Sequence, residues 1–179
     1  MDIQKLSFPI GKYRPTENPG IELINAWIKD IEEFPAKLEQ LTKNISFEKL
    51  EWKYRPNGWS VKQVIHHCAD SHMNSIIRFK LALTEDSPVI RPYEEDKWAE
   101  LFDYNADEIQ NSLALLKALH RKWIILLKSL SSEQLALQFV HPEHGRKTDL
   151  AQNIGIYAWH CNHHYAHVLN GINSKGIYN

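Results

Sequence analysis

The sequence lacks any long apolar run. Its longest uninterrupted stretch of apolar residues covers positions 123–127, whereas a helix that crosses a membrane needs about 20. The first residues include Asp2 and Lys5 and lack the apolar stretch of about 7 to 15 residues that marks a secretory signal. We therefore expect a cytoplasmic protein that has no membrane contact.

An excess of charge of either sign is also missing. The chain carries 21 Lys and Arg against 22 Asp and Glu, which leaves a formal net charge of -1. A protein without a strong positive field has little to attract phosphate backbones or acidic lipids. The composition therefore argues against nucleic acid as a partner.

Cysteine is scarce, which argues against a disulfide-stabilised scaffold. Cys68 and Cys161 are the only cysteines and could form at most one bridge. Because a reducing cytoplasm keeps thiols reduced, we expect both to be free.

The length and composition fit one globular domain. The chain has 179 residues, of which 43% are hydrophobic and 24% charged, and both values are ordinary for a soluble domain. We predict a single helical domain over residues 1–179. Within it, proline and glycine predict that residues 1–18 form an extended N-terminal arm.

Apolar residues recur at helical spacing in four long segments, approximately 19–42, 60–84, 105–130 and 149–171. Ser60 with Gln63 and Asn105 with Glu108 have the spacing of a capping box. Pro35 predicts a kink in the first helix, and no segment alternates convincingly as a strand. The predicted fold class is all-α, a four-helix bundle whose long connections carry short helices, one of them near 94–101.

Histidine is abundant, and its side chain can bind metals and take part in catalysis. Most of the 10 histidines lie in two stretches, 65–72 and 160–167. His160 and His164 are one helical turn apart, so both project from one side of their helix. On a helical wheel they lie at the margin of the apolar stripe, where a cleft between helices would be. His67 has a comparable margin position on its own helix, whereas His66 lies farther toward solvent.

These three imidazoles, His67, His160 and His164, are the candidate metal ligands. Three neutral imidazoles that leave a coordination position open resemble a catalytic zinc site. A metal there would lower the pKa of bound water toward about 7 and polarise a substrate oxygen. Since nickel also accepts imidazole, we expect one divalent metal per chain, zinc first and nickel second.

The remaining histidines have simpler interpretations. His72 is predicted to be a hydrogen-bonded core residue, and His120 to pack within its helix. His163 and His167 would form a solvated face or lie just behind the ligands. His141 and His144 precede the last helix and would cover the site or simply be polar. No carboxylate stands out as a general base; Asp70, Glu85 and Glu143 remain unranked candidates.

Two motifs carry a resemblance to a known family. They are Y-R-P-N-G-W-S-V-K-Q-V-I-H-H-C-A-D-S-H at 54–72 and Y-A-W-H-C-N-H-H-Y-A-H at 157–167. Shorter likenesses are P-I-G-K-Y at 9–13, R-F-K-L-A-L-T-E-D at 78–86 and P-Y-E-E-D-K-W at 92–98. Together they resemble the YfiT metal-dependent hydrolases of the wider DinB-like group.

This resemblance implies a four-helix bundle, a divalent metal held at the positions of His67, His160 and His164, and a cytoplasmic homodimer. The implied function is a metal-dependent hydrolase that activates water against a small-molecule substrate. An alternative from the same group is a transferase of a low-molecular-weight thiol, of the bacillithiol type. A third possibility is a binding module in which the metal only stabilises the bundle. The catalytic residues are unknown at this point.

Overall fold

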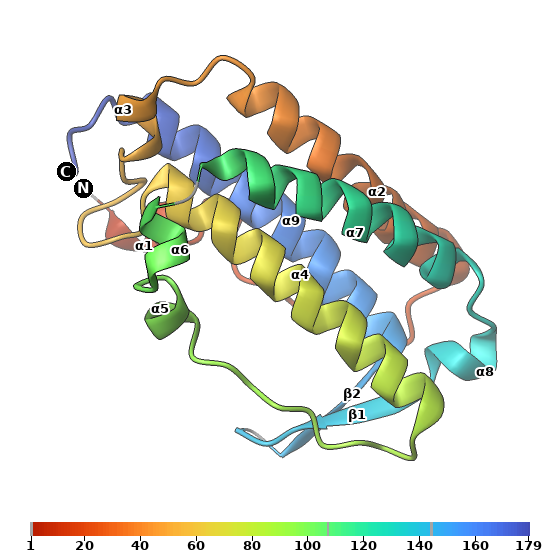
Figure 1. Ribbon diagram of the computed structural model, residues 1–179. Helices are drawn as coiled ribbons and strands as arrows, with labels where there is room; N and C mark the ends of the chain where they lie inside the picture. The colour runs from red at the N-terminus through yellow and green to blue at the C-terminus, as the bar shows by residue number, and fades with distance from the viewer. Residues whose placement is uncertain (1, 107, 144) are drawn as a thin grey trace.

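A computed structural model describes residues 2–106, 108–143 and 145–179. Four long helices form its body (Figure 1): α2 (Ile21–Thr42), α4 (Val61–Thr84), α7 (Ile109–Lys128) and α9 (Leu150–Asn173). Their connections carry the short helices α3 (Phe47–Leu50), α5 (Glu95–Trp98), α6 (Phe102–Ala106) and α8 (Ser132–Leu135). The predicted four-helix bundle with short helices in its connections is confirmed.

The helices are not packed in chain order. α2 packs mainly against α7 and α9, and α4 packs mainly against the same two helices. The consecutive helices α2 and α4 therefore lie on a diagonal of the bundle. This arrangement makes α4 and α9, which carry the two histidine-rich stretches, direct neighbours along their length.

A continuous apolar core holds the four helices together. Ile31, Leu38, Phe79, Leu116 and Trp123 have at most 2% of their surface exposed. Removing such side chains from water is the main favourable contribution to folding. Both cysteines are free and buried within this core, as predicted from their scarcity.

The capping box predicted at the start of α4 is present. Ser60 Oγ accepts from the backbone N–H of Gln63, and the Gln63 side chain accepts from the backbone N–H of Ser60. The capping box predicted at Asn105 and Glu108 is wrong, because Asn105 belongs to α6 and α7 begins only at Ile109. Pro35 does not interrupt the first helix, because α2 continues through it from Ile21 to Thr42.

The helical bundle carries one short hairpin that the sequence did not indicate. β1 (Gln138–His141) and β2 (Arg146–Asp149) form an antiparallel hairpin just before α9. Each strand is short, and β2 is entirely polar, so neither has the pattern of a half-buried strand. The hairpin is stabilised by tertiary contacts: Phe139 is buried, and Val140 exchanges backbone hydrogen bonds with the connection at Pro88 and Ile90.

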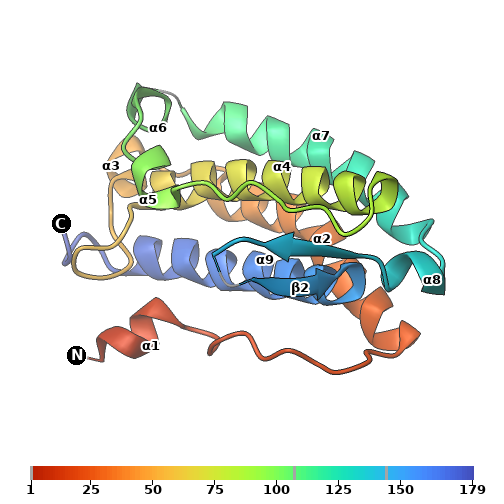
Figure 2. The same ribbon diagram turned by 90° about the horizontal axis from the view of Figure 1, so that it is seen from below.

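The prediction of an extended arm over residues 1–18 is only partly correct, because residues 3–7 form the short helix α1 (Ile3–Ser7). The Asp2 side chain caps it by accepting from two backbone N–H groups. The rest of the arm runs antiparallel to α9 along the bundle (Figure 2). Gly11 accepts from Trp159 Nε1, and Tyr13 donates to the Gln152 side chain farther along.

None of the helices in the described ranges is both long enough and apolar enough to span a membrane.

The capping box of α4 yields a stability prediction. Ser60→Ala removes an acceptor for an otherwise unpaired helix N–H and should lower the free energy of unfolding by about 1 kcal/mol. Urea denaturation measures this loss. Ser131→Ala is the matched control, because Ser131 is exposed and forms the same box at the start of the short helix α8 rather than of a bundle helix. An equal loss in both variants would contradict the importance assigned to the start of α4.

Candidate metal centre

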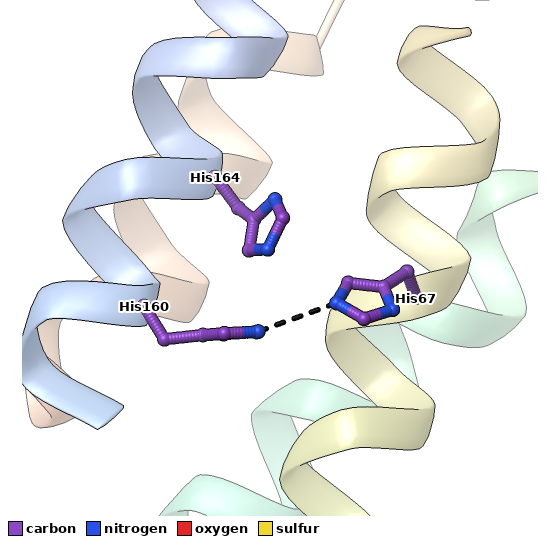
Figure 3. Close-up of side chains that lie close together, drawn as sticks. All are labelled: His67, His160 and His164. Carbon is purple, nitrogen blue, oxygen red and sulfur yellow. Dashed lines mark hydrogen bonds between the residues drawn. The ribbon is translucent and has the colours of Figure 1, made fainter. Parts of the chain in front are cut away.

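The three predicted ligands converge between α4 and α9. His67 projects from α4, and His160 and His164 project from successive turns of α9 (Figure 3). Each offers one ring nitrogen, and these nitrogens all lie within 4.8 Å of one another. The Nε2 atoms of His67 and His160 are 3.3 Å apart.

This spacing suits a common metal ion. Two ligand nitrogens that each lie about 2.1 Å from one tetrahedral ion are about 3.4 Å apart. The observed separation between His67 and His160 is 3.3 Å, so that pair already has the required spacing, and the limit of 4.8 Å for the whole cluster leaves at most about 1.4 Å for the rings to close. Within the described residues, the cluster contains neither a carboxylate nor a thiol, and its three imidazoles would leave coordination positions open.

The protonation state of the rings also fits a metal. Burial lowers the pKa of His67 to about 4, with a smaller contribution from His163. Burial, followed by the neighbouring histidines, holds the pKa values of His160 and His164 well below their usual range. All three rings are therefore neutral near pH 7, and a neutral imidazole has a lone pair to donate.

Other histidines are closer to the centre than the helical wheel indicated. His66 does not turn toward solvent: it is buried, and its Nδ1 lies 2.8 Å from Ser112 Oγ of α7. His163 and His167 are buried as well, so the solvated-face interpretation is wrong. A helical wheel describes one helix in isolation. It therefore could not show that α7, the arm and the loop at 54–59 cover the faces on which these histidines lie.

Two hollows open beside the cluster and share His160, Glu95 and Asp96 in their walls. The first, about 590 Å³, lies between α4, the segment 92–97 and the hairpin. The second, about 450 Å³, lies between the arm, the loop at 54–59 and α9. His160 is only partly buried, so its ring is accessible from this space.

The first hollow contains charged groups that the sequence did not single out. Arg78 of α4 lines it, and in the part of the chain that the structure describes its Nε has no hydrogen-bond partner. Glu95 borders both hollows. Desolvation, and then the carboxylates of Asp96 and Glu143, raise the pKa of Glu95. The motif at 92–98 lies in a long connection of the kind that often covers a site, but only the structure places its residues in hollows that His160 also lines.

The earlier carboxylate candidates lie in different surroundings. Asp70 accepts a hydrogen bond of 2.6 Å from Tyr104 of α6 and lines neither hollow. Glu85 is the C-cap of α4, far along the chain from the cluster. Glu143 does line the first hollow, together with His141, while His144 lies outside the described residues.

Comparison with known proteins decides the family. A model of the DinB superfamily matches residues 30–168. The chain belongs to the DinB superfamily. YfiT of Bacillus subtilis, provisionally named a metal-dependent hydrolase, is 47% identical over 91% of this chain and 92% of its own. A similarly named protein of Oceanobacillus iheyensis is 48% identical over 90% of this chain and 92% of its own.

The solved structure of YfiT matches with a TM-score of 0.93 and 45% identity, covering 96% of this chain and 98% of the YfiT chain. That structure is described as "a probable metal-dependent hydrolase with an unusual four-helix bundle topology". The predicted resemblance to the YfiT group is confirmed, and the diagonal order of α2 and α4 in this DinB-superfamily chain belongs to the same architecture.

The geometry predicts how a ligand variant of this DinB-superfamily protein behaves. His160→Ala should leave the purified protein nearly free of metal, because two imidazoles cannot hold the ion as three do. Elemental analysis after dialysis measures the metal, and circular dichroism checks that the helices persist. His163→Ala is the control from the same helix, since His163 is outside the cluster, and it should retain its metal. Full metal content in His160→Ala would contradict the site.

The lowered histidine pKa values predict the pH dependence of stability without metal. An unfolded histidine has a pKa near 6.5, so between about pH 4 and 6.5 the unfolded state binds more protons than the folded state. Stability is then retained above about pH 7 and lost on acidification. Burial lowers the pKa of His120 to about 4. One such imidazole lowers the free energy of unfolding at pH 5 by about 2 kcal/mol relative to its value at neutral pH.

Urea denaturation in a chelating buffer at several pH values measures this slope. His120→Asn should have a shallower slope, because it lacks one of the depressed imidazoles. A free energy of unfolding that stayed constant or rose on acidification would contradict the assignment of neutral, desolvated rings.

Proposed function

We propose that this protein is a metal-dependent hydrolase whose single divalent metal, zinc or nickel, is held by His67, His160 and His164. The observation that carries the proposal is the convergence of three neutral imidazole nitrogens on a point beside two solvent-accessible hollows. A structural zinc site would normally be closed by four protein ligands. The names of the B. subtilis and O. iheyensis relatives support the same class of reaction.

The metal would supply Lewis acidity, which polarises a substrate carbonyl or phosphoryl group and acidifies water. Glu95 would then be the residue that accepts a proton from the attacking water, since it lines both hollows and His160 lines both as well. Its pKa is raised, first by desolvation, which brings it closer to the working pH of a general base. The same carboxyl can return the proton to the leaving group.

Arg78 supports a substrate that carries an anionic or strongly polar group. Arg78 lines the first hollow, as His160 does, and its Nε is buried and lacks a hydrogen-bond partner among the described residues. A guanidinium offers several donors in a planar arrangement that matches a carboxylate or phosphate. Arg78 would therefore orient the substrate with its scissile bond toward the histidines.

Transfer of a low-molecular-weight thiol is the second candidate. The observation that favours it is the presence of two separate hollows at the same metal-binding residue. One hollow could receive an electrophile and the other a thiol, whose sulfur would form the new bond as the leaving group departs. The second hollow is lined by Arg55, Trp59 and Trp159, which offer a cation and flat apolar surfaces to such a molecule.

An electrophile panel separates the candidates. Metal-loaded protein is assayed on esters, amides, phosphate esters and alkyl halides, each with and without an added thiol such as cysteine. Thiol-independent cleavage supports the hydrolase, and turnover that requires the thiol supports the transferase. Inactivity throughout, combined with a large drop in melting temperature on chelation, would contradict both and favour a structural metal.

Glu95→Gln tests the base. The amide cannot accept the proton, so kcat should fall by about 100-fold or more while metal content stays unchanged. Glu100→Gln is the control, since Glu100 is nearby on the chain yet lines neither hollow. An unchanged kcat in Glu95→Gln would remove Glu95 from the mechanism.

A further inference from the structure

A proline in the middle of α2 leaves a backbone carbonyl available to another helix. Pro35 lies within the helix and is buried. Proline has no N–H, so the residue that would normally donate to the carbonyl four positions earlier cannot do so. That carbonyl belongs to Ile31, and the Nδ1 of His120 on α7 lies 2.7 Å from its oxygen.

The carbonyl determines which nitrogen of His120 carries the proton. A carbonyl oxygen only accepts, so Nδ1 must be the donor, and in a neutral ring Nε2 is then an acceptor. The Nε2 of His120 lies 2.7 Å from Nδ1 of His72 on α4. His72 therefore donates through Nδ1, which makes its own Nε2 an acceptor.

The same reasoning reaches the metal centre. His72 Nε2 lies 3.0 Å from Nδ1 of His160, so His160 donates through Nδ1. Its Nε2 is left with a lone pair, and this is the atom that lies 3.3 Å from His67 Nε2. We call this sequence of contacts from Ile31 through His120 and His72 to His160 the long histidine chain.

A second, shorter chain reaches the other ligand of α9. The carbonyl of Ser7 belongs to the last turn of α1, where carbonyls have no helical donor. His167 Nε2 donates to it across 3.2 Å, so His167 Nδ1 is an acceptor. That atom lies 3.4 Å from His164 Nδ1, which leaves the lone pair of His164 on Nε2. The ring of His167 is stacked on Tyr54 at a centroid distance of 3.9 Å.

We propose that His72, His120 and His167 are positioning residues that fix the tautomers of the two α9 ligands, so that both present an Nε2 lone pair before a metal binds. Metal-bound histidines commonly donate their second N–H to an acceptor, which orients the ring and increases its basicity. Here both acceptors are themselves histidines, held in turn by backbone carbonyls. The proposal depends on the metal-binding role of His160 and His164 but not on the reaction catalysed.

The third ligand has no such support. In the part of the chain that the structure describes, His67 Nδ1 is buried with no hydrogen-bond partner. Without metal, His67 would donate from Nε2 to His160, and its tautomer would have to change when the ion arrives. The α9 pair is thus the prearranged half of the site, and His67 is the half that adjusts. Neither chain conducts protons to solvent, because each ends on a carbonyl.

The first test needs no variant and no metal. Nitrogen NMR of metal-free protein labelled with ¹⁵N-histidine distinguishes a protonated Nδ1 from a protonated Nε2. We expect His160, His164, His72 and His120 to carry the proton on Nδ1, and His167 to carry it on Nε2. A proton on Nε2 of His160 or His164 in the wild-type protein would overturn the proposal.

The second test breaks the long histidine chain far from the metal. His120→Asn keeps a donor near Ile31 but removes the nitrogen that accepts from His72. The Nε2–H tautomer of His160 should then become populated, and the affinity for Zn²⁺ in chelator competition should fall about 10- to 100-fold. His66→Asn is the matched control, because it replaces another buried histidine that bonds to α7 outside both chains. It should leave the His160 tautomer and the Zn²⁺ affinity unchanged.

The shorter chain is tested by His167→Phe, which can retain the stacking on Tyr54 but has no nitrogen. It should alter the tautomer of His164 and leave that of His160 as in the wild type. Zn²⁺ affinity that is unchanged in both His120→Asn and His167→Phe would overturn the proposal. Because none of these measurements uses a substrate, a failure to find hydrolysis would contradict the proposed function without affecting this result.

Discussion

Burial of the imidazoles between α4 and α9, nearly complete for His67 and His164 and partial for His160, is the constraint on which the site depends. Burial keeps the rings of His67, His160 and His164 neutral by lowering their pKa values. A protonated ring there would lose its hydration with no opposite charge to replace it, and it would have no lone pair to donate to a cation. The packing that stabilises the bundle therefore also produces the electronic state that metal binding requires.

This arrangement has a cost, because each buried imidazole has two polar nitrogens that water can no longer satisfy. In this protein several of these nitrogens form hydrogen bonds with other imidazoles. A neutral ring offers one donor and one acceptor, so rings can be joined in series, and each series must end on a group that only donates or only accepts. The carbonyls of Ile31 and Ser7 are such groups. A proline and a helix end, which usually weaken local structure, are what make these carbonyls available.

The connections between the long helices form much of the surroundings of the histidine cluster. α5 and the hairpin form walls of the first hollow, and the arm and the loop at 54–59 form walls of the second. Long loops in compact domains commonly carry binding and catalytic groups because a rigid scaffold positions them. Here the helices provide the three candidate ligands, and the connections provide Glu95 and other walls of the hollows that His160 lines.

The sequence by itself determined the long helices, the capping box at Ser60 and the candidate ligands, because these follow from periodicities of three to four residues within one element. It could not predict the hairpin, since four-residue strands depend on Phe139 and Val140 contacting segments distant in the chain. Only the tertiary structure decided that His66 is buried against α7, that Glu95 and His160 line the same hollows, and that His120 and His167 reach backbone carbonyls. The physical reason is that burial, pKa and hydrogen-bond direction belong to pairs of groups from different elements, and such pairs exist only once the helices have packed.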